Sequence, residues 1–89
     1  MPYRVELTKS AQHQLDALQD REARQIARAL WQLQDNPRPR GSIKLRGTGL
    51  YWRIRVGNYR AIYAIFDKES TVRVVRAARR SERTYDDLS

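Results

Sequence analysis

Arginine is the residue type in this sequence best suited to do chemistry, and most of the arginines lie in the second half of its 89 residues. Such a concentration of positive charge favours a polyanionic partner, because a guanidinium group binds phosphate through paired hydrogen bonds. Together with the net charge of +8, it predicts contact with nucleic acid. Between Asp35 and Asp67 there are seven cationic residues and no acidic one: Arg38, Arg40, Lys44, Arg46, Arg53, Arg55 and Arg60. Four more arginines precede Glu82 in and after the last predicted strand: Arg73, Arg76, Arg79 and Arg80.

The spacing of residues 51–60 places several of these side chains on one surface. Between positions 51 and 56 apolar and polar residues alternate, as in a strand with one buried face. Arg53 and Arg55 therefore share the face that we expect to be in solvent, about 7 Å apart, with Tyr51 beside them. Arg60 follows the predicted two-residue turn Gly57-Asn58 and can join them from the next strand.

Tyrosines are interspersed with these arginines, and this mixture favours single-stranded RNA. Unpaired bases stack on aromatic rings, while guanidinium groups hold the phosphates. Tyr85 falls about a turn into a predicted final helix, after the strand that ends at Arg79 or Arg80. Beside the hairpin arginines, the residues that we expect to contact RNA are Arg80, Lys44, Arg46, Tyr51 and Arg76.

Each of these features also has an ordinary structural interpretation. Arginines on an antiparallel sheet are often a solvated face, although a long run of cations without an acid makes this less favoured here. Trp31 is expected to be partly buried on its helix, and Trp52 to belong to the core. Tyr59 and Tyr63 share one strand face and are predicted to pack there. His13 falls on a polar flank of the first helix and is predicted to lie on the surface.

The composition excludes several classes of function. The sequence has no cysteine and one histidine, so it predicts no disulfide, no thiolate catalysis, no metal site and no cofactor. Its N-terminal residues lack the basic and apolar regions of a secretory signal, and no stretch approaches the ~20 apolar residues of a membrane span. We therefore expect a cytoplasmic protein.

The order of periodic segments predicts a single domain over residues 1–89, of the α+β class. It is an antiparallel β-sheet meander with an N-terminal αα-hairpin packed on one face and a short C-terminal helix, in the order β-α-α-β-β-β-α. Thr8 and Asp20 are the predicted N-caps of the two hairpin helices, and Pro37 ends the second helix near Asn36. The predicted strands are 3–7, 51–56, 59–66 and 71–78, and the last helix is 81–88.

Two motifs resemble those of the RelE/ParE toxin superfamily. The run Lys44-Leu45-Arg46-Gly47 and the segment 52–63, Trp-Arg-Ile-Arg-Val-Gly-Asn-Tyr-Arg-Ala-Ile-Tyr, are similar to its central hairpin. The segment 79–85, Arg-Arg-Ser-Glu-Arg-Thr-Tyr, is similar to its closing motif, and the leading αα-hairpin fits as well. The similarity spans nearly the whole chain.

The resemblance implies a toxin of a type II toxin–antitoxin system. Members that resemble RelE cut mRNA in the ribosomal A site and are suppressed by a cognate antitoxin. Because this chain is strongly basic, we expect its antitoxin to bind through an acidic segment. The partners implied are therefore an antitoxin, mRNA and the ribosome. The family's catalytic positions fall on Arg53, Arg55, Arg60, Arg79 (or its neighbour Arg80) and Tyr85.

Metal-free RNA cleavage by the adjacent 2′-OH requires groups that move protons as well as groups that stabilise charge. The two hairpin positions are lysine in some RelE-like members, whereas here they are Arg53 and Arg55, which cannot act as bases. Tyr85 is the best titratable candidate, for proton transfer or for stacking on a base, and Lys44 is a weaker candidate for the base. Arg60 and Arg79 would bind the scissile phosphate.

Two other functions remain open from the sequence. A toxin of the same fold could act without catalysis by inhibiting DNA gyrase, or the chain could be an RNA-binding module without activity. Relatives that act on gyrase usually lack the complete set of basic residues and tyrosine, so the resemblance favours the RNase.

Overall fold

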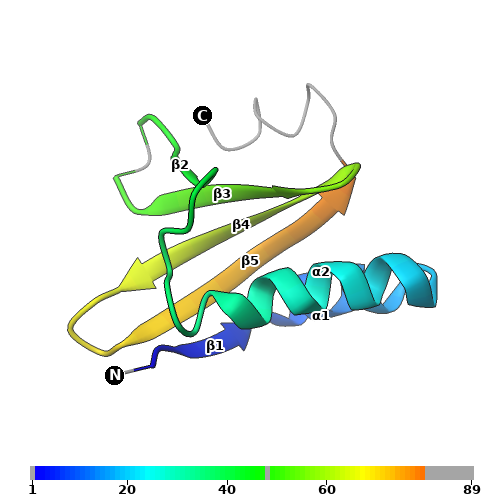
Figure 1. The fold of residues 1–89 in the computed structure, drawn as a ribbon, viewed down its shortest axis with the longest axis horizontal. Coiled ribbons are helices and arrows are strands. Elements are labelled where there is room, and N and C mark those ends of the chain that lie inside the picture. Colours follow the sequence, from blue (N-terminus) through cyan, green and yellow to red (C-terminus); the bar gives the residue numbers. More distant parts are fainter. Residues whose placement is uncertain (1, 48, 80–89) are drawn as a thin grey trace.

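A computed structural model of the protein describes residues 2–47 and 49–79. One five-stranded sheet carries two helices on one of its faces, as Figure 1 shows. The elements follow the chain as β1 (Arg4–Leu7), α1 (Lys9–Asp16), α2 (Asp20–Gln32), β2 (Ile43–Lys44), β3 (Tyr51–Val56), β4 (Tyr59–Phe66) and β5 (Thr71–Arg79). The predicted α+β class and the αα-hairpin are confirmed, while the predicted helix 81–88 lies outside the described residues.

The sheet has the strand order β1-β5-β4-β3-β2. Strands β3, β4 and β5 form the predicted antiparallel meander, with the predicted turn at Gly57-Asn58. Strand β1, whose orientation the sequence did not predict, pairs with β5 in parallel, from Arg4 opposite Thr71 to Leu7 opposite Val74. The sheet is therefore mixed. The short strand β2, which the periodicity did not predict, adds an edge through its antiparallel pairing with β3.

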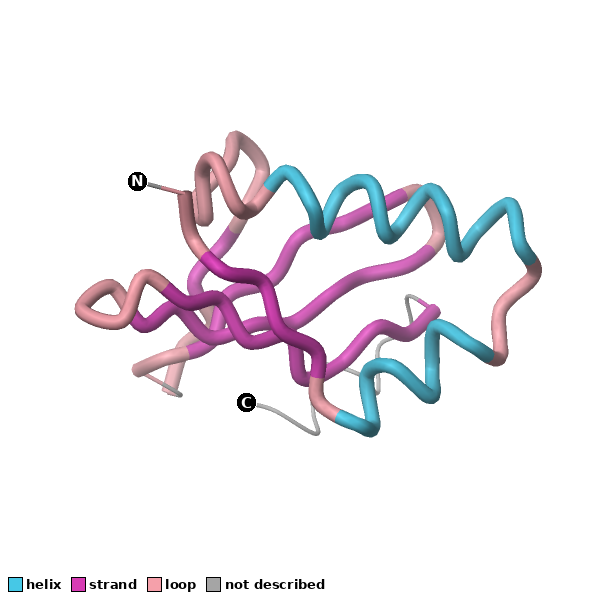
Figure 2. Tube along the Cα trace, turned by 90° about the horizontal axis from the view of Figure 1, so that it is seen from below, coloured by secondary structure: helices cyan, strands magenta, loops and turns pink. Residues whose placement is uncertain are grey.

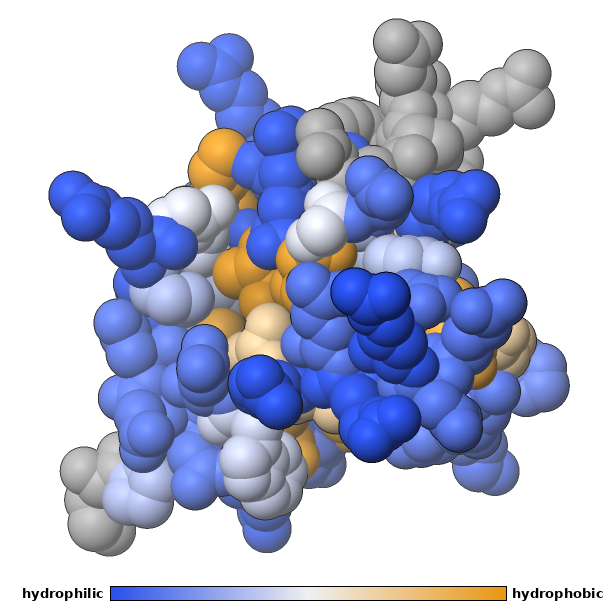
Figure 3. Space-filling model, turned by 45° about the vertical axis from the view of Figure 1, so that its right-hand side comes forward, coloured by the Kyte–Doolittle hydropathy of each residue, from blue (hydrophilic) through white to orange (hydrophobic). Residues whose placement is uncertain are grey.

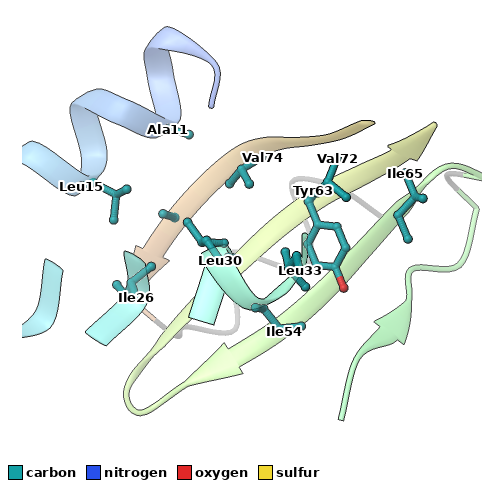
Figure 4. Close-up of a cluster of buried hydrophobic side chains, with 12 residues drawn as sticks. Ala11, Leu15, Ile26, Leu30, Leu33, Ile54, Tyr63, Ile65, Val72 and Val74 are labelled. Carbon is teal, nitrogen blue, oxygen red and sulfur yellow. The ribbon is translucent and has the colours of Figure 1, made fainter. Parts of the chain in front are cut away.

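Both helices bury their apolar stripes against the same face of the sheet (Figure 4). α1 contributes Ala11 and Leu15, and α2 contributes Ile26, Leu30 and Leu33. In Figure 2 both helices extend to the same side from the connection at residues 17–19, so the chain runs in roughly opposite directions along them. The strands supply the other half of the core, from Ile54, Ala61, Tyr63, Ile65, Val72, Val74 and Ala77.

The helix ends differ in part from those expected. Thr8 is the N-cap of α1 as predicted, and its Oγ1 accepts a hydrogen bond from the Ala11 amide at 3.1 Å. The predicted cap Asp20 is instead the first residue of α2, and Gln19 is the N-cap without a side-chain hydrogen bond. Asp20 still stabilises the helix start, because a carboxylate there interacts favourably with the helix dipole. The helix ends at Gln32, short of the expected Asn36.

The aromatic residues also include one correction. Trp31 was expected to be partly buried, but 65% of its surface is exposed on the outer face of α2. Trp52 is half-buried and packs against the core cluster, in keeping with its predicted place. Tyr63 is fully buried and Tyr59 packs beside the cluster, so both are packing residues as predicted. His13 is on the surface as expected.

None of the helices within residues 2–47 and 49–79 is both long enough and apolar enough to span a membrane. The same described residues contain no group of three histidine, cysteine or acidic side chains placed to hold a metal ion.

Candidate nucleic-acid interface

The sheet face opposite the helices brings together arginines from three adjacent strands. Arg53 of β3 lies opposite Ile62 of β4, which in turn lies opposite Arg76 of β5. In the next row Arg55 lies opposite Arg60. Residues directly opposite each other in an antiparallel pair point to the same face. We call these four residues, Arg53, Arg55, Arg60 and Arg76, the arginine face.

The β3–β4 hairpin fixes the positions of three of these arginines. Its two-residue turn has Gly57 at φ +59°, a left-handed conformation that glycine adopts without steric cost. Val56 and Tyr59 close the turn, so Arg55 and Arg60 form the next cross-strand pair. The side chains of such a pair lie about 5 Å apart at Cβ. The turn therefore places the side chains of Arg55 and Arg60 next to each other.

Two members of the arginine face are buried, whereas the sequence predicted a charged face turned to solvent. Arg53 and Arg60 are each 3% exposed, Arg76 is half-buried and Arg55 is exposed. The Nε atoms of Arg53, Arg60 and Arg76 are all shielded from solvent. Alternation along a strand predicts which face a side chain points to, but it does not predict what lies over that face. Fully buried arginines are rare in proteins, which marks this cluster as unusual.

Tyr51 lies on the same face, further along β3, opposite Ala64 of β4. It borders a shallow hollow of about 420 Å³ whose other walls are Arg76, Val75 and two residues of α1, Ser10 and Gln14. The predicted neighbourhood of Tyr51 and the arginines is therefore present. It places an aromatic ring next to a guanidinium group at the edge of a concave surface.

Arg79 does not join the arginine face. It lies opposite Tyr59, and its guanidinium carbon is 5.9 Å from the centre of the Tyr59 ring. Tyr59 packs against the core on the helix side of the sheet, so Arg79 projects to that side. Its neighbour Ala78, opposite Arg60, occupies the arginine-face position in that row. Of the two residues predicted to join Arg60, Arg79 or Arg80, Arg79 therefore does not do so, and Arg80 lies outside the described residues.

The other predicted RNA contacts lie away from the arginine face or outside the described residues. Lys44 is exposed on the edge strand β2 and lies opposite Trp52, so it points to the helix side of the sheet. Arg46 is exposed in the segment between β2 and β3. Neither is part of the arginine face. Arg80 and Tyr85 lie outside the described residues.

Arg38 is one of the seven cationic residues that lie between Asp35 and Asp67 in the sequence. In the structure it has an acidic partner. Its Nη2 lies 2.8 Å from Asp67 Oδ2, and its Nη1 donates to Asp67 Oδ1 at 3.3 Å. The Tyr3 hydroxyl donates to the same Oδ1 at 2.7 Å. The hydrogen bond from Arg38, followed by that from Tyr3, holds the pKa of Asp67 below its ordinary value, and the bond to Asp67 raises the pKa of Tyr3.

This cluster fixes the segment that links α2 to β2, and sequence reasoning missed it. The Arg38 guanidinium lies 5.4 Å from the centre of the Trp52 ring, and the buried Tyr63 hydroxyl donates to the Pro37 carbonyl at 2.8 Å. Burial raises the pKa of Tyr63 to about 12. The only local signal was the stiff sequence Asn36-Pro37-Arg38-Pro39. Its partners are far away along the chain, so no periodicity reveals them.

A family model described as the ParE toxin of the type II toxin–antitoxin system matches residues 5–84. The chain belongs to this toxin family. It is therefore a toxin of a type II toxin–antitoxin system, and the predicted membership of the RelE/ParE superfamily is confirmed. A search of the curated proteins found no match.

Solved structures with the same fold are RelE toxins. The archaeal RelE of the RelE–RelB complex from Pyrococcus horikoshii is 31% identical, with a TM-score of 0.81 over 92% of this chain and 99% of that one. The RelBE2 toxin–antitoxin complex of Mycobacterium tuberculosis contains a chain 29% identical, with a TM-score of 0.80, covering 90% of this chain and all of that one. Free E. coli RelE, as a double mutant, is 23% identical with a TM-score of 0.79, over 99% and 95% of the two chains; this shows the shared fold.

Proposed function

We propose that the protein is a ribosome-dependent endoribonuclease that cleaves mRNA in the A site and so inhibits translation. The observation that carries this proposal is the arginine face, where Arg53 and Arg60 are buried beside Arg55 and Arg76. Burying a charged side chain costs stability, so a cluster with two buried arginines is a candidate for a functional site. The likeness to the Pyrococcus horikoshii and Mycobacterium tuberculosis toxins supports the RelE-like branch.

In this reaction the 2′-OH attacks the adjacent phosphate in line, so the protein needs no nucleophile and no metal ion. Negative charge develops on the phosphate oxygens and on the leaving 5′-oxygen. Arg60 stabilises that charge, and Arg53 and Arg55 hold the backbone on either side. Guanidinium groups are well suited to this work because they remain protonated and bind phosphate with a fixed fork geometry.

Proton transfer falls to a different residue type. Tyr85 is the proposed acid or base, because arginines cannot fill that role at neutral pH. Of the two residues that the resemblance allows for the second phosphate-binding role, Arg79 and Arg80, we propose Arg80, because Arg79 lies over the Tyr59 ring on the helix side of the sheet. A site with so few titratable groups depends on the ribosome to orient the message. Free RNA is then cut slowly or not at all.

The proposed partner that suppresses the toxin is a cognate antitoxin with an acidic segment. The similar structures from Pyrococcus horikoshii and Mycobacterium tuberculosis are a RelE–RelB complex and a RelBE2 toxin–antitoxin complex, which supports a protein partner of this kind. With a net charge of +8, this chain attracts an acidic segment that folds on binding.

The deciding experiment is primer extension on an mRNA that is being translated in a purified system. Wild-type protein should produce new 5′ ends within A-site codons, and these should be absent when ribosomes are omitted and when Arg60→Ala replaces the wild type. An intact message with active, folded wild-type protein would overturn the proposal.

The second candidate function is inhibition of DNA gyrase without catalysis. It is favoured by one observation, namely that the matching family model is that of the ParE toxins. It predicts that the protein blocks supercoiling by purified gyrase while the translated message stays intact. Unchanged supercoiling with toxin in molar excess over gyrase would remove this candidate.

A further inference from the structure

A second set of arginines lies on the outer face of α2, away from the arginine face. Arg21, Arg24 and Arg28 are exposed, and Trp31 at the end of the same row is 65% exposed. Their spacing of three, four and three residues puts all four side chains within an arc of about 80° on the helix. We call these four residues the α2 ridge; it extends about 15 Å along the helix axis.

No ion pair in the part of the chain that the structure describes involves the α2 ridge, although Asp16 and Asp20 line the same hollow as Arg24. Among residues 2–47 and 49–79, none of its three arginines lies within ion-pair distance of an acidic side chain. Arg24 Nε donates to the backbone carbonyl of Asp20 at 3.4 Å. Arg38, by contrast, is held by Asp67 through two contacts. The ridge thus presents guanidinium groups that are available to an anionic partner.

Trp31 gives the α2 ridge a second property. Trp31 places a large aromatic ring, 65% exposed, at one end of the row of arginines. A ring at one end of a row of guanidinium groups can stack on a ribose or a base while the arginines hold phosphates.

The α2 ridge cannot contact the RNA strand that lies on the arginine face. The apolar face of α2 packs on the helix side of the sheet, so the ridge points away from the sheet altogether. In Figure 3 the surface in the lower half of the view, where the helices lie, is mostly hydrophilic. The sheet and α2 together separate the two basic surfaces by more than the ~10 Å of one packed layer. A second RNA element is needed to occupy the ridge.

We infer that the α2 ridge binds the phosphate backbone of structured ribosomal RNA and so positions the toxin on the ribosome. This inference rests on the proposed function for its choice of the ribosome as the source of that RNA. Structured RNA is recognised mainly by its shape and its backbone, which suits a straight row of cations. A protein partner would call for several apolar anchors, whereas the ridge offers three cations and a single apolar side chain.

The test is equilibrium binding of the purified toxin to 70S ribosomes with an empty A site, at several salt concentrations. The ridge variant is R24Q/R28Q, in which glutamine keeps the helix propensity. The matched control is K9Q/K68Q, which removes the same charge from two exposed residues outside both the ridge and the arginine face. Circular dichroism and thermal unfolding confirm that each variant is folded. W31A is measured alongside.

The ridge variant should bind ribosomes about 10- to 100-fold more weakly near 0.1 M salt, with a shallower salt dependence by about 1.5 to 2 in slope. The control should stay within about twofold of wild type, because its lost charges only weaken the long-range field. W31A should weaken binding with no change in the salt slope. Equal losses in R24Q/R28Q and K9Q/K68Q, or no ribosome binding by the wild type, would overturn the inference.

The failure of the inference can be told apart from a failure of the proposed function. If wild-type protein cleaves the translated message while R24Q/R28Q binds and cleaves as well as wild type, only the docking surface is wrong. If wild-type protein binds ribosomes through the ridge but leaves every message intact, the docking surface is correct and the endonuclease proposal is wrong.

Discussion

Arg55 and Arg60 lie directly opposite each other across the β3–β4 hairpin, yet one is exposed and the other is 3% exposed. Like charges placed opposite each other destabilise a hairpin, so the pair works against folding. The exposed Arg55 can reach a long stretch of RNA backbone, whereas Arg60 is fixed in place. A fixed guanidinium group is what transition-state stabilisation requires, because it does not need to reorganise as charge develops.

Replacing Arg60 should therefore affect chemistry more than binding. Under the endonuclease proposal, Arg60→Ala lowers the cleavage rate on translated mRNA by about 10²- to 10³-fold, the usual effect of removing one transition-state donor. Arg60→Lys keeps the charge but loses the fork geometry, and should recover only part of the rate. The measurement is single-turnover cleavage by ribosome-bound toxin. Arg4→Ala, at the exposed edge of β1, is the control.

Because Arg60 is buried, thermal unfolding of each variant must accompany that measurement. A folded Arg60→Ala protein that cleaves at the wild-type rate would show that Arg60 has a structural role only.

Tyr85 can act by proton transfer or by stacking, and one substitution separates the two roles. Phenylalanine retains the ring but has no hydroxyl. If Tyr85 moves a proton, Tyr85→Phe should lower the cleavage rate by about 10²- to 10⁴-fold, the range typical of general acid–base catalysis. If it stacks on a base, Tyr85→Phe should cleave nearly as well as wild type and Tyr85→Ala should not. Equal activity of all three proteins would exclude both roles.

The hydrogen bond from Tyr63 to the Pro37 carbonyl fixes the segment between α2 and β2. Tyr63 is fully buried and Pro37 is buried, so Tyr63→Phe leaves the carbonyl without this donor. We expect the free energy of unfolding to fall by about 1–2 kcal/mol, with no change in the urea m-value. Urea unfolding followed by circular dichroism measures this. A variant as stable as wild type would indicate that another donor replaces the hydroxyl.

The contacts of Asp67 make the stability of the protein depend on pH. Its pKa is lowered in the folded protein by Arg38 and Tyr3, compared with about 3.9 for an unfolded aspartate. A lowered folded-state pKa stabilises the fold fully above the unfolded pKa, and this stabilisation is lost as the pH falls through the folded pKa. Wild type should exceed Asp67→Asn in stability by a constant amount between about pH 5 and 7.

That difference should then decrease as the pH falls below about 4. It should be small throughout, because both Arg38 and Asp67 are largely exposed and solvent weakens their attraction. Urea unfolding of both proteins across this pH range is the check. A difference that stays constant down to the lowest pH would mean that Asp67 acts through packing rather than charge.

The sequence by itself determined those features that depend on neighbouring residues. The bounds of β3 and β4 match the predicted ranges, because alternation of apolar and polar residues and the Gly57-Asn58 turn are local signals. The Thr8 cap and the apolar stripes of both helices are equally local. The motifs in residues 44–63 and 79–85 are also stretches of adjacent residues, and they were enough to indicate the toxin superfamily.

The tertiary structure alone decided which charged residues share a surface and which are covered. The pairing of β4 with β5 shifts in register between Ile62, which lies opposite Arg76, and Tyr63, which lies opposite Val74. Beyond this shift Arg79 lies opposite Tyr59 and is not part of the arginine face. Period-two alternation in the sequence does not reveal such a shift. The alternation also does not predict that Arg38 pairs with Asp67, 29 residues away. Nor does it predict that Arg60 is buried while Trp31 is exposed to solvent. Such outcomes depend on contacts between segments far apart along the chain, and local periodicity carries no information about them.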